Sequence, residues 1–267
     1  SSKQLIIAVL PDDKYYDKSF SDIEHFIEQM AQGTHGLDYF IVLYSKDLAD
    51  KLYQQNHGLP FGPKTLRIVT NVSLDLWIRD FGLIGPEKQV KFKYLPKYLK
   101  PQKAKFSDRQ FNDFLKNVGV KVTHSDIVLD GGNVVDNNRD KAIISERILE
   151  ENKGKTKKEL KMALQNLLNM TIAFIPDPGD TTGHSDGIVS FIEDDVVLIA
   201  DYNDPDYFKD VESSIKNTFP AVRTVRVECK DSKRRDKNWR GFTPAVGSCV
   251  NILATDNALY VPQFANR

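Results

Sequence analysis

Three short segments of this sequence carry acidic and imidazole side chains in a combination that suits a guanidinium group. Residues 77–80 read Trp-Ile-Arg-Asp, residues 129–133 read Leu-Asp-Gly-Gly-Asn, and residues 183–187 read Gly-His-Ser-Asp-Gly. Together they offer three carboxylates and one histidine beside expected strands and turns. Carboxylate oxygens form forked, charge-assisted hydrogen bonds with a planar cation that has several N–H donors. The sequence therefore predicts a site for such a cation.

Asp80 and Asp130 each have an ordinary structural interpretation besides the chemical one. In an extended segment, Ile78 and Asp80 would share a face, and an acid among apolar neighbours needs a partner. A salt-bridged structural acid is the alternative. Asp130 follows an expected strand, and Gly131-Gly132 allows a sharp turn there. Since Asp-Gly is a common turn dipeptide, an ordinary turn is the alternative for Asp130.

His184 lies in a run rich in Pro, Gly and Asp, which predicts a loop that leads into a strand. A single histidine in a loop is usually only solvated. Asp186, however, is two residues away and would point to the same side of an extended segment. This places an acid–base group beside a carboxylate. No His-x-x-x-His or Cys-x-x-Cys pair is present, so no metal site is predicted.

Cys229 and Cys249 are the two cysteines, which is too few for a disulfide framework; one disulfide or two free thiols both stay open. Cys249 and His184 would make a thiol–imidazole pair of the kind used in nucleophilic catalysis. Cys249, however, begins an expected apolar strand, where an inert buried thiol is the commoner outcome. We therefore do not expect Cys249 to be a nucleophile, and the nucleophile stays unassigned.

The composition narrows the class of protein. The 267 residues are 40% hydrophobic, enough for one large core or two small ones. Lys+Arg and Asp+Glu both number 37, and zero net charge argues against a nucleic-acid partner. No apolar run approaches membrane-spanning length, so no membrane partner is expected. No signal-peptide core opens the chain, which favours the cytoplasm and leaves open secretion after removal of such a peptide.

Short apolar, β-branched runs recur along the whole chain and predict strands, while segments with helical spacing fall between them. The first expected helix follows a capping box at Ser21 and Glu24. Strands are expected at residues 5–10, 39–43, 66–69, 83–84, 127–129, 141–144, 171–175, 188–192, 196–200, 224–227, 250–254 and 258–261, and helices at 21–31, 46–54, 108–117, 157–168 and 206–219.

The order of these elements predicts a mixed α/β fold. Two hairpins are expected, one over 187–200 with its turn at 193–195 and one over 250–261 with its turn at 256–257. The order in which a hairpin, a helix and a strand follow one another indicates a repeated β-β-α-β unit rather than a doubly wound parallel sheet. No internal sequence repeat supports this, so it depends on the pattern alone. No low-complexity linker divides the chain, and we expect one domain over 1–267.

The motifs together resemble the guanidino-group-modifying enzymes, and most of all the agmatine deiminase and bacterial peptidylarginine deiminase family. In that family a Trp-x-Arg-Asp segment precedes an acidic-Gly-Gly-Asn segment and a Gly-His-x-Asp segment. A small-Ser-x-Val-Asn segment and a Val-Pro-Gln-Phe strand follow. Here the matching residues are 77–80, 130–133, 183–186, 248–251 and 261–264. One such motif is weak evidence, but several in the same order are fairly specific.

The resemblance implies a pentein-type five-bladed α/β propeller of ββαβ units and a site without a cofactor. Asp80 and Asp186 would hold the guanidinium, and Trp77 would lie against the aliphatic arm of the substrate. His184 would be the general acid and base, oriented by Asp130. Asn251 matches an active-site asparagine of some bacterial members.

The implied reaction is the conversion of a guanidine into a ureido product and ammonia through a cysteine thiouronium intermediate. Agmatine, a substrate of polyamine biosynthesis, is slightly favoured over arginine or protein arginine, whose product is citrulline. A catalytically inactive guanidine-binding or interaction protein is the alternative. An amidinotransferase or methylarginine hydrolase on the same fold is a weaker one. The expected partner is a small guanidine, and a homodimer is left open.

The sequence departs from the family pattern in three places. Asp130 stands where relatives often carry Glu, and Cys249 stands where relatives usually have an aromatic residue. The nucleophile of the family lies in a Gly-Gly-x-x-His-Cys segment beyond the strand that 261–264 resembles, and 1–267 does not include it. We therefore expect the last blade to be incomplete in this chain.

Overall fold

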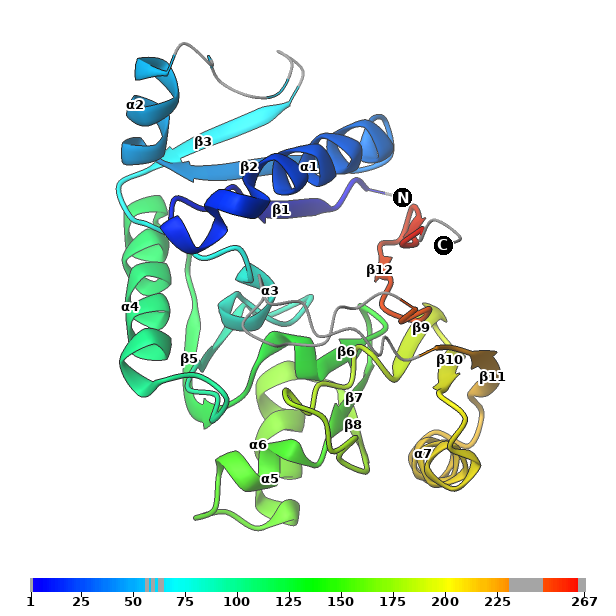
Figure 1. Ribbon diagram of the computed structural model, residues 1–267. Coiled ribbons are helices and arrows are strands. Elements are labelled where there is room, and N and C mark those ends of the chain that lie inside the picture. Colours follow the sequence, from blue (N-terminus) through cyan, green and yellow to red (C-terminus); the bar gives the residue numbers. More distant parts are fainter. Residues whose placement is uncertain (1, 56–57, 59–60, 62–64, 231–246, 264–267) are drawn as a thin grey trace.

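The computed structural model describes residues 2–55, 58, 61, 65–230 and 247–263. Within these residues the strands form five small separate sheets. Figure 1 shows the sheets following one another around a ring, from the first sheet at the top, past α4 on the left and α6 at the bottom, to α7 and β12 on the right. The fold is therefore mixed α/β and not a doubly wound parallel sheet, as expected.

The first sheet contains β1 (Leu5–Val9), β2 (Tyr39–Ser45) and β3 (Leu66–Thr70), all parallel. Apolar residues of α1 and α2 cover one face of it, around Phe40 and Val42. The second sheet pairs β4 (Val90–Lys93) with β5 (Thr123–Val128), also in parallel. The connecting segments are η1 (Lys14–Ser19), α1 (Phe20–Thr34), α2 (Lys46–Gln54), α3 (Ile78–Phe81) and α4 (Pro101–Val118).

The third and fourth sheets are complete ββαβ units. In each, an antiparallel hairpin is followed by a helix and then by a strand parallel to the second strand of the hairpin. The fifth sheet is the antiparallel hairpin β12 (Leu253–Ala254) and β13 (Leu259–Tyr260). The third unit contains η2 (Gly131–Asn133), β6 (Val134–Asp136), β7 (Lys141–Ser145), α5 (Arg147–Glu151), α6 (Lys157–Leu168) and β8 (Thr171–Ile175), and the fourth β9 (Val189–Glu193), β10 (Val196–Asp201), α7 (Pro205–Thr218) and β11 (Arg223–Glu228).

Helices α4, α6 and α7 also pack against the sheet of the preceding unit. Phe111 of α4 lies in one cluster with Val9 and Leu43 of the first sheet. Leu160 of α6 packs with Val90 of the second sheet. The same arrangement holds for α7 and the third sheet. The apolar stripes of these three helices therefore link neighbouring units, because neither a lone small sheet nor a lone helix can bury its apolar face.

Hydrogen bonds to one carboxylate join the fifth unit to the first. Asp38, at the start of β2, accepts hydrogen bonds from Thr255, Asn257 and Tyr260 of the last hairpin, at 2.7 to 2.8 Å. The backbone N–H of Gln4 donates to the same carboxylate at 3.0 Å. Figure 1 shows β12 near the N-terminal end of β1. We call this carboxylate and its four donors the Asp38 clasp.

Most of the expected elements are confirmed, including α2, α6 and β8 with their full bounds and both hairpins. Two strands were not expected, β4 and β6, because both are short and contain charged residues. Residues 83–84 do not form a strand; Ile84 makes a single antiparallel bridge with Val90. The charge-rich residues 153–158, which lead into α6 and form its start, are exposed.

Two further local expectations were wrong. Residues 77–80 are not extended, because the backbone N–H of Asp80 bonds to the carbonyl of Trp77 at the start of the short helix α3. Helix α1 has no capping box at Ser21, since it continues directly from η1 and begins at Phe20. A capping box is instead formed at Thr156, the N-cap of α6, with Glu159.

Candidate active site

The segments that carry the acidic and histidine motifs meet at one end of the second and third sheets. The backbone N–H of Gly132 donates to Oδ1 of Asp80 at 3.1 Å, and the N–H of Asp186 donates to the carbonyl of Gly132 at 3.2 Å. A Cβ on Gly132 would lie 2.7 Å from that Asp80 oxygen, and also against His184. Only glycine therefore allows these three segments to approach so closely.

Asn133 fixes the same junction with its side chain. Its Oδ1 accepts from the backbone N–H of Ser145 at 2.9 Å and from that of Ser185 at 3.1 Å. Its Nδ2 donates to the carbonyl of Ser145 at 3.3 Å, and the whole residue is buried. The amide therefore satisfies buried backbone groups of β7 and of the loop that carries His184.

His184 lies between two carboxylates that come from different segments. Its Nε2 is 2.9 Å from Oδ2 of Asp130, and its Nδ1 is 3.9 Å from Oδ1 of Asp80. Asp186 follows two residues later, in a turn rather than in the extended segment that would place it and His184 on one side. We call Asp80, Asp130, His184 and Asp186 the His184 cluster.

The loop before His184 is held by Arg147 of α5. The guanidinium makes two hydrogen bonds with the carboxylate of Asp177, at 2.6 and 3.1 Å. It also donates to the carbonyls of Asp180 and Thr181, at 2.7 and 3.1 Å. Gly183 has a φ of +67°, and a side chain there would collide with Arg147. The backbone on which His184 stands is therefore fixed before any ligand binds.

Burial and mutual repulsion raise the proton affinity of the acids. Burial raises the pKa of Asp80 to about 6; the charges of Asp130 and Asp186 add to this and the attraction of His184 opposes it. Burial also raises the pKa of Asp186, against the attraction of His184 and Arg79. Carboxylates in this condition gain free energy when a cation neutralises them.

The acids also raise the proton affinity of the imidazole. Burial alone would lower the pKa of His184, but the hydrogen bond to Asp130 and the charges of Asp80 and Asp186 outweigh it and raise the pKa to about 9. His184 is therefore protonated at neutral pH. A protonated imidazole beside three acids can donate a proton to a leaving group, and the acids around it can hold a cationic ligand.

Arg79 occupies part of the space beside Asp186. Its Nε is 3.7 Å from the Asp186 carboxylate, and its terminal nitrogen donates to the carbonyl of Val134 at 2.9 Å. Half of the Arg79 side chain is exposed, whereas the Asp186 side chain is largely buried. The protein itself thus places one guanidinium near Asp186.

Trp77, Asn251 and the motif at 261–264 were also expected at the site. Trp77 immediately precedes α3 and has half of its surface exposed. Asn251 is exposed, in the segment before β12. Residues 261–263 are described, but Phe264 of the expected strand motif lies outside the described residues. Trp77 is joined to the His184 cluster through its backbone carbonyl, which accepts from the N–H of Asp80 at 3.0 Å.

Cys249 does not begin a strand, contrary to expectation. It lies in a turn before β12, and its sulfur contacts the carbonyl oxygens of Gly247 at 3.1 Å and Glu228 at 3.8 Å. Both cysteines are free thiols, and a side-chain hydrogen bond joins Cys249 to Cys229. Burial and this contact raise the pKa of Cys229 to about 12, so that thiol is inert at neutral pH.

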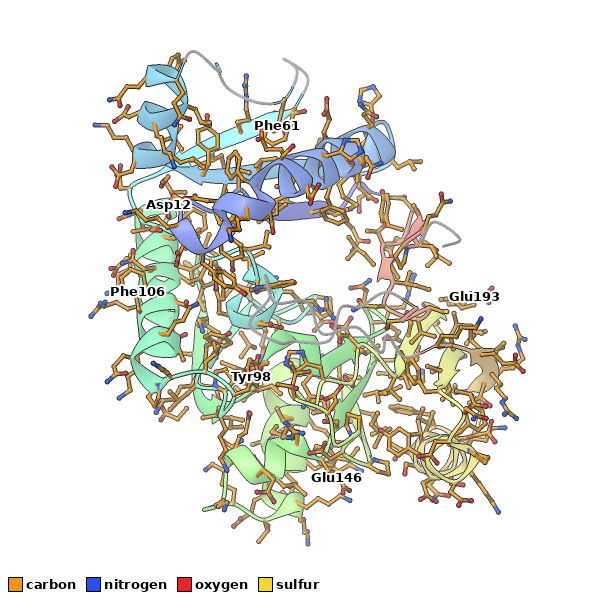
Figure 2. The ribbon with its side chains drawn as sticks, in the orientation of Figure 1. Asp12, Phe61, Tyr98, Phe106, Glu146 and Glu193 are labelled. Carbon is orange, nitrogen blue, oxygen red and sulfur yellow. The ribbon has the colours of Figure 1, made fainter. Side chains whose placement is uncertain are left out.

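Two residues of the site were not predicted from the sequence. Tyr98 donates from its hydroxyl to Asp130 at 2.7 Å, and Figure 2 shows it near the middle of the molecule. Glu151, at the end of α5, has its pKa raised to about 7 by burial and by the charge of Asp130. Neither residue belongs to a recognisable motif, and both lie more than 20 residues from Asp130 in the sequence.

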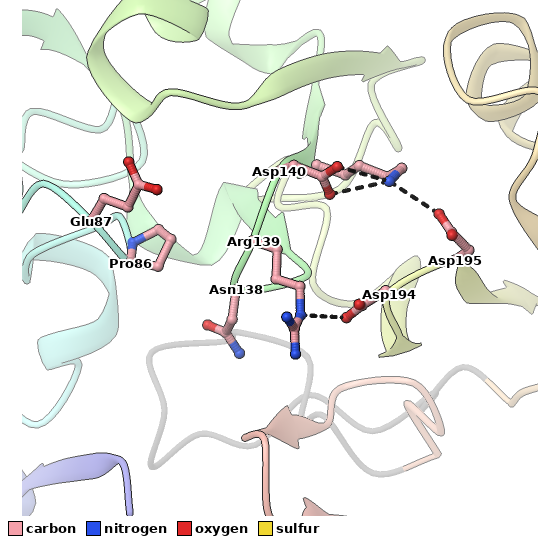
Figure 3. A pocket seen from close by; sticks show the side chains of 8 residues that line it. Pro86, Glu87, Asn138, Arg139, Asp140, Asp194 and Asp195 are labelled. Carbon is pink, nitrogen blue, oxygen red and sulfur yellow. Dashed lines mark hydrogen bonds and ion pairs between the residues drawn. The ribbon is translucent and has the colours of Figure 1, made fainter. Parts of the chain in front are cut away.

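The described residues also contain a polar pocket of about 430 Å³ among the hairpin turns, shown in Figure 3. Its charges are paired: Arg139 with Asp194 at 2.8 Å, and Lys141 with Asp195 at 3.0 Å. It shares no lining residue with the His184 cluster. In the part of the chain that the structure describes, no group of three His, Cys, Asp or Glu side chains could hold a metal ion, and no helix is long and apolar enough to cross a membrane.

Comparison with solved structures defines the class of fold. A structure described as a putative peptidyl-arginine deiminase matches with a TM-score of 0.76 and 17% identity, over 100% of this chain and 84% of that one. The agmatine deiminase of C. jejuni gives 0.75 and 17%, over 100% and 82%. The agmatine deiminase of Enterococcus faecalis gives 0.74 and 17%, over 99% and 82%. This chain therefore has the pentein-type α/β fold of the guanidino-group deiminases.

The sequence itself identifies the family. The model of the Porphyromonas-type peptidyl-arginine deiminases matches residues 1–267, and this chain belongs to that family. A search of curated proteins gave no match. The family resemblance expected from these motifs is thus confirmed over the whole chain.

Proposed function

We propose that this protein binds a small guanidine at the His184 cluster and acts on it as a guanidine iminohydrolase, releasing ammonia and a ureido product. Agmatine is the favoured substrate, and an arginine side chain is the second choice. The observation that best supports this proposal is the imidazole of His184, 2.9 Å from Asp130 and 3.9 Å from Asp80. These distances place carboxylates that can bind a cation beside an imidazole that can donate a proton.

Asp80 and Asp186 would hold the guanidinium. Both side chains are largely buried and both have a raised pKa. The free energy of each charged carboxylate therefore becomes more favourable when a cationic ligand binds beside it. Two carboxylates fix the plane of a guanidinium through forked hydrogen bonds. The aliphatic arm of the ligand would lie towards Trp77, whose side chain is half-exposed one residue before α3.

The proposed reaction then runs in two steps. A thiolate attacks the central carbon of the guanidinium, and the imidazolium of His184 gives its proton to the departing nitrogen, which leaves as ammonia. The neutral imidazole next takes a proton from water, which attacks the thiouronium carbon; the carbon–sulfur bond breaks and the ureido product leaves. For the thiolate, the family resemblance implies a segment beyond the Val-Pro-Gln-Phe motif at 261–264.

The contacts of Cys249 favour a second candidate function. Its sulfur faces the carbonyls of Gly247 and Glu228, and none of its contacts described here reaches His184. A chain that keeps the acids but has no thiol beside them would bind guanidines without converting them. This second candidate is a guanidine-binding protein on the same fold.

One experiment separates these functions. The protein is incubated with agmatine, arginine and an arginyl peptide; ureido product is assayed, and the melting temperature is measured with each ligand. A ureido product establishes the iminohydrolase, and a raised melting temperature without product establishes the binding protein. Asp186→Asn should weaken binding at least tenfold, since it removes one of two carboxylates. If no guanidine is bound or converted, both functions are wrong.

Asp194→Asn is the matched control. Asp194 is also an acid paired with an arginine, Arg139, at 2.8 Å, but it lies in the polar pocket among the hairpin turns. Its loss should leave guanidine binding unchanged. An equal effect of both substitutions would mean that the ligand responds to overall charge and not to the His184 cluster.

A further inference from the structure

Tyr98 is tied to the most buried acid of the His184 cluster. Its hydroxyl donates to Oδ2 of Asp130 at 2.7 Å. Asp130 is only 3% exposed, and its Oδ1 has no hydrogen-bond partner in the described part of the chain. A buried carboxylate with one unpaired oxygen depends strongly on the donors of the other oxygen.

The same Asp130 oxygen also faces His184. Nε2 of His184 is 2.9 Å from Oδ2, so the hydroxyl and the imidazole share one acceptor atom. The rings of Tyr98 and His184 also meet edge to face, with centroids 6.1 Å apart. Tyr98 therefore contacts both Asp130 and His184, which we call the Asp130–His184 pair. Both contacts restrict how the carboxylate and the imidazole can rotate.

Tyr98 is itself supported by a rigid part of the fold. A side-chain hydrogen bond joins it to Tyr94, which directly follows β4 and is buried. The Tyr94 ring packs edge to face on Phe81 of α3, with centroids 5.7 Å apart. Since Asp80 belongs to α3, the tyrosine pair connects both acids that flank His184.

We propose that Tyr98 is a positioning residue that orients the Asp130 carboxylate and sets how strongly the Asp130–His184 pair holds its proton. For turnover this inference rests on the proposed function. For the proton affinity of the pair it does not, because the hydrogen bond exists without a substrate.

The direction of the effect follows from charge. The hydroxyl is neutral and donates to an anion, so it stabilises Asp130 most when His184 is neutral and the carboxylate bears its full charge. Removing the hydroxyl makes the pair more basic. Other groups also act on the pair and are the same in wild type and variant: Asp80 from α3, Asp186 from the His184 loop, Lys91 from β4, and Glu151 from α5.

The test is Tyr98→Phe, read by NMR titration of the His184 imidazole in the ligand-free protein. We expect the apparent pKa of the pair to rise by about one unit, a tenfold change in proton affinity. A merely structural role would not shift it, because Phe keeps the ring. With agmatine, kcat should fall about tenfold while KM changes little, since Tyr98 touches the acid–base pair and not the guanidinium.

Two further substitutions keep the inference falsifiable. Replacement of Tyr98 by 3-fluorotyrosine makes the hydroxyl a stronger donor and should shift the same pKa downwards. Tyr16→Phe is the matched control, since Tyr16 is also buried and also hydrogen-bonded to an acid, Asp75, but in the first unit; it should leave the titration of His184 unchanged.

The outcomes separate the two proposals. If wild-type protein neither binds nor converts a guanidine, the proposed function is wrong and the titration still decides the role of Tyr98. If the His184 titration is the same in wild type, Tyr98→Phe and the fluorinated protein, the positioning role is wrong whatever the activity is.

Discussion

The Asp38 clasp and the His184 cluster use the same kind of residue in opposite ways. Asp38 is 5% exposed and accepts four hydrogen bonds, from Gln4, Thr255, Asn257 and Tyr260. Burial would raise the pKa of Asp38, but these donors outweigh it and lower the pKa to about 2. This acid is therefore charged in the folded protein above about pH 2, and it joins the first and last units of the ring.

The acids of the His184 cluster have fewer donors. Asp80 accepts from the backbone N–H of Gly132, and its pKa is raised to about 6. Asp130 leaves one oxygen unpaired in the described residues. A carboxylate that accepts hydrogen bonds at all its positions contributes to stability. A buried carboxylate with few hydrogen-bond donors is destabilised, and a cationic ligand that binds to it relieves this cost. The number of hydrogen-bond donors therefore distinguishes the structural acid Asp38 from the acids of the His184 cluster.

The largest effect is expected from Gly132→Ala. The new Cβ would collide with Asp80 and His184, and a shift of the site by a fraction of an ångström should weaken agmatine binding about 100-fold. Gly33→Ala is the matched control, since nothing lies within 4 Å of a Cβ there and the residue is helical. It should stabilise the protein by about 0.5–1 kcal/mol in urea unfolding. Unchanged binding in Gly132→Ala would contradict the close approach.

Exchanging one carboxylate for an amide in each region should separate stability from binding. Asp38→Asn should lower the free energy of unfolding by about 2 kcal/mol, because hydrogen bonds to a charge are lost, and should leave agmatine binding unchanged. Asp80→Asn should do the reverse: binding falls at least tenfold, while stability is unchanged or higher, because a buried charge is removed. Urea unfolding and ligand titration measure the two effects. The comparison fails if both variants lose stability equally.

The smallest effects are on pH dependence, and the two regions should respond at opposite ends of the scale. The lowered pKa of Asp38 stabilises the protein above its ordinary value of 3.8, and this is lost as pH falls towards 2. The raised pKa of His184 stabilises the protein below its ordinary value of 6.5, and this is lost as pH rises through 9.

Melting temperatures of the wild type and the variants from pH 2 to 10 test this pattern. Asp38→Asn should flatten only the acid limb, and His184→Gln only the alkaline limb. Agmatine affinity should fall below about pH 6, where Asp80 takes up a proton. Affinity that is constant between pH 5 and 8 would rule out Asp80 as a ligand for the cation.

Much of the His184 cluster could be predicted, because Asp80, Asp130, His184 and Asp186 stand in short motifs whose order is informative. Tyr98 could not be predicted, since it is 32 residues from Asp130 and follows no pattern. The role of Asp38 was equally hidden, because its partner Thr255 is 217 residues away. Asp80 was assigned to an extended segment, since four residues are too few to distinguish a single helical turn from a strand by periodicity.

The amino-acid order alone determined the alternation of strands and helices, the α/β class and the chemistry of the candidate side chains, because these depend on local periodicity and residue type. The tertiary structure decided which carboxylates accept hydrogen bonds at all their positions and which do not. It thereby decided whether each carboxylate stabilises the ring or can bind a ligand. Proton affinity depends on burial and on neighbours through space, and those neighbours come from distant parts of the chain.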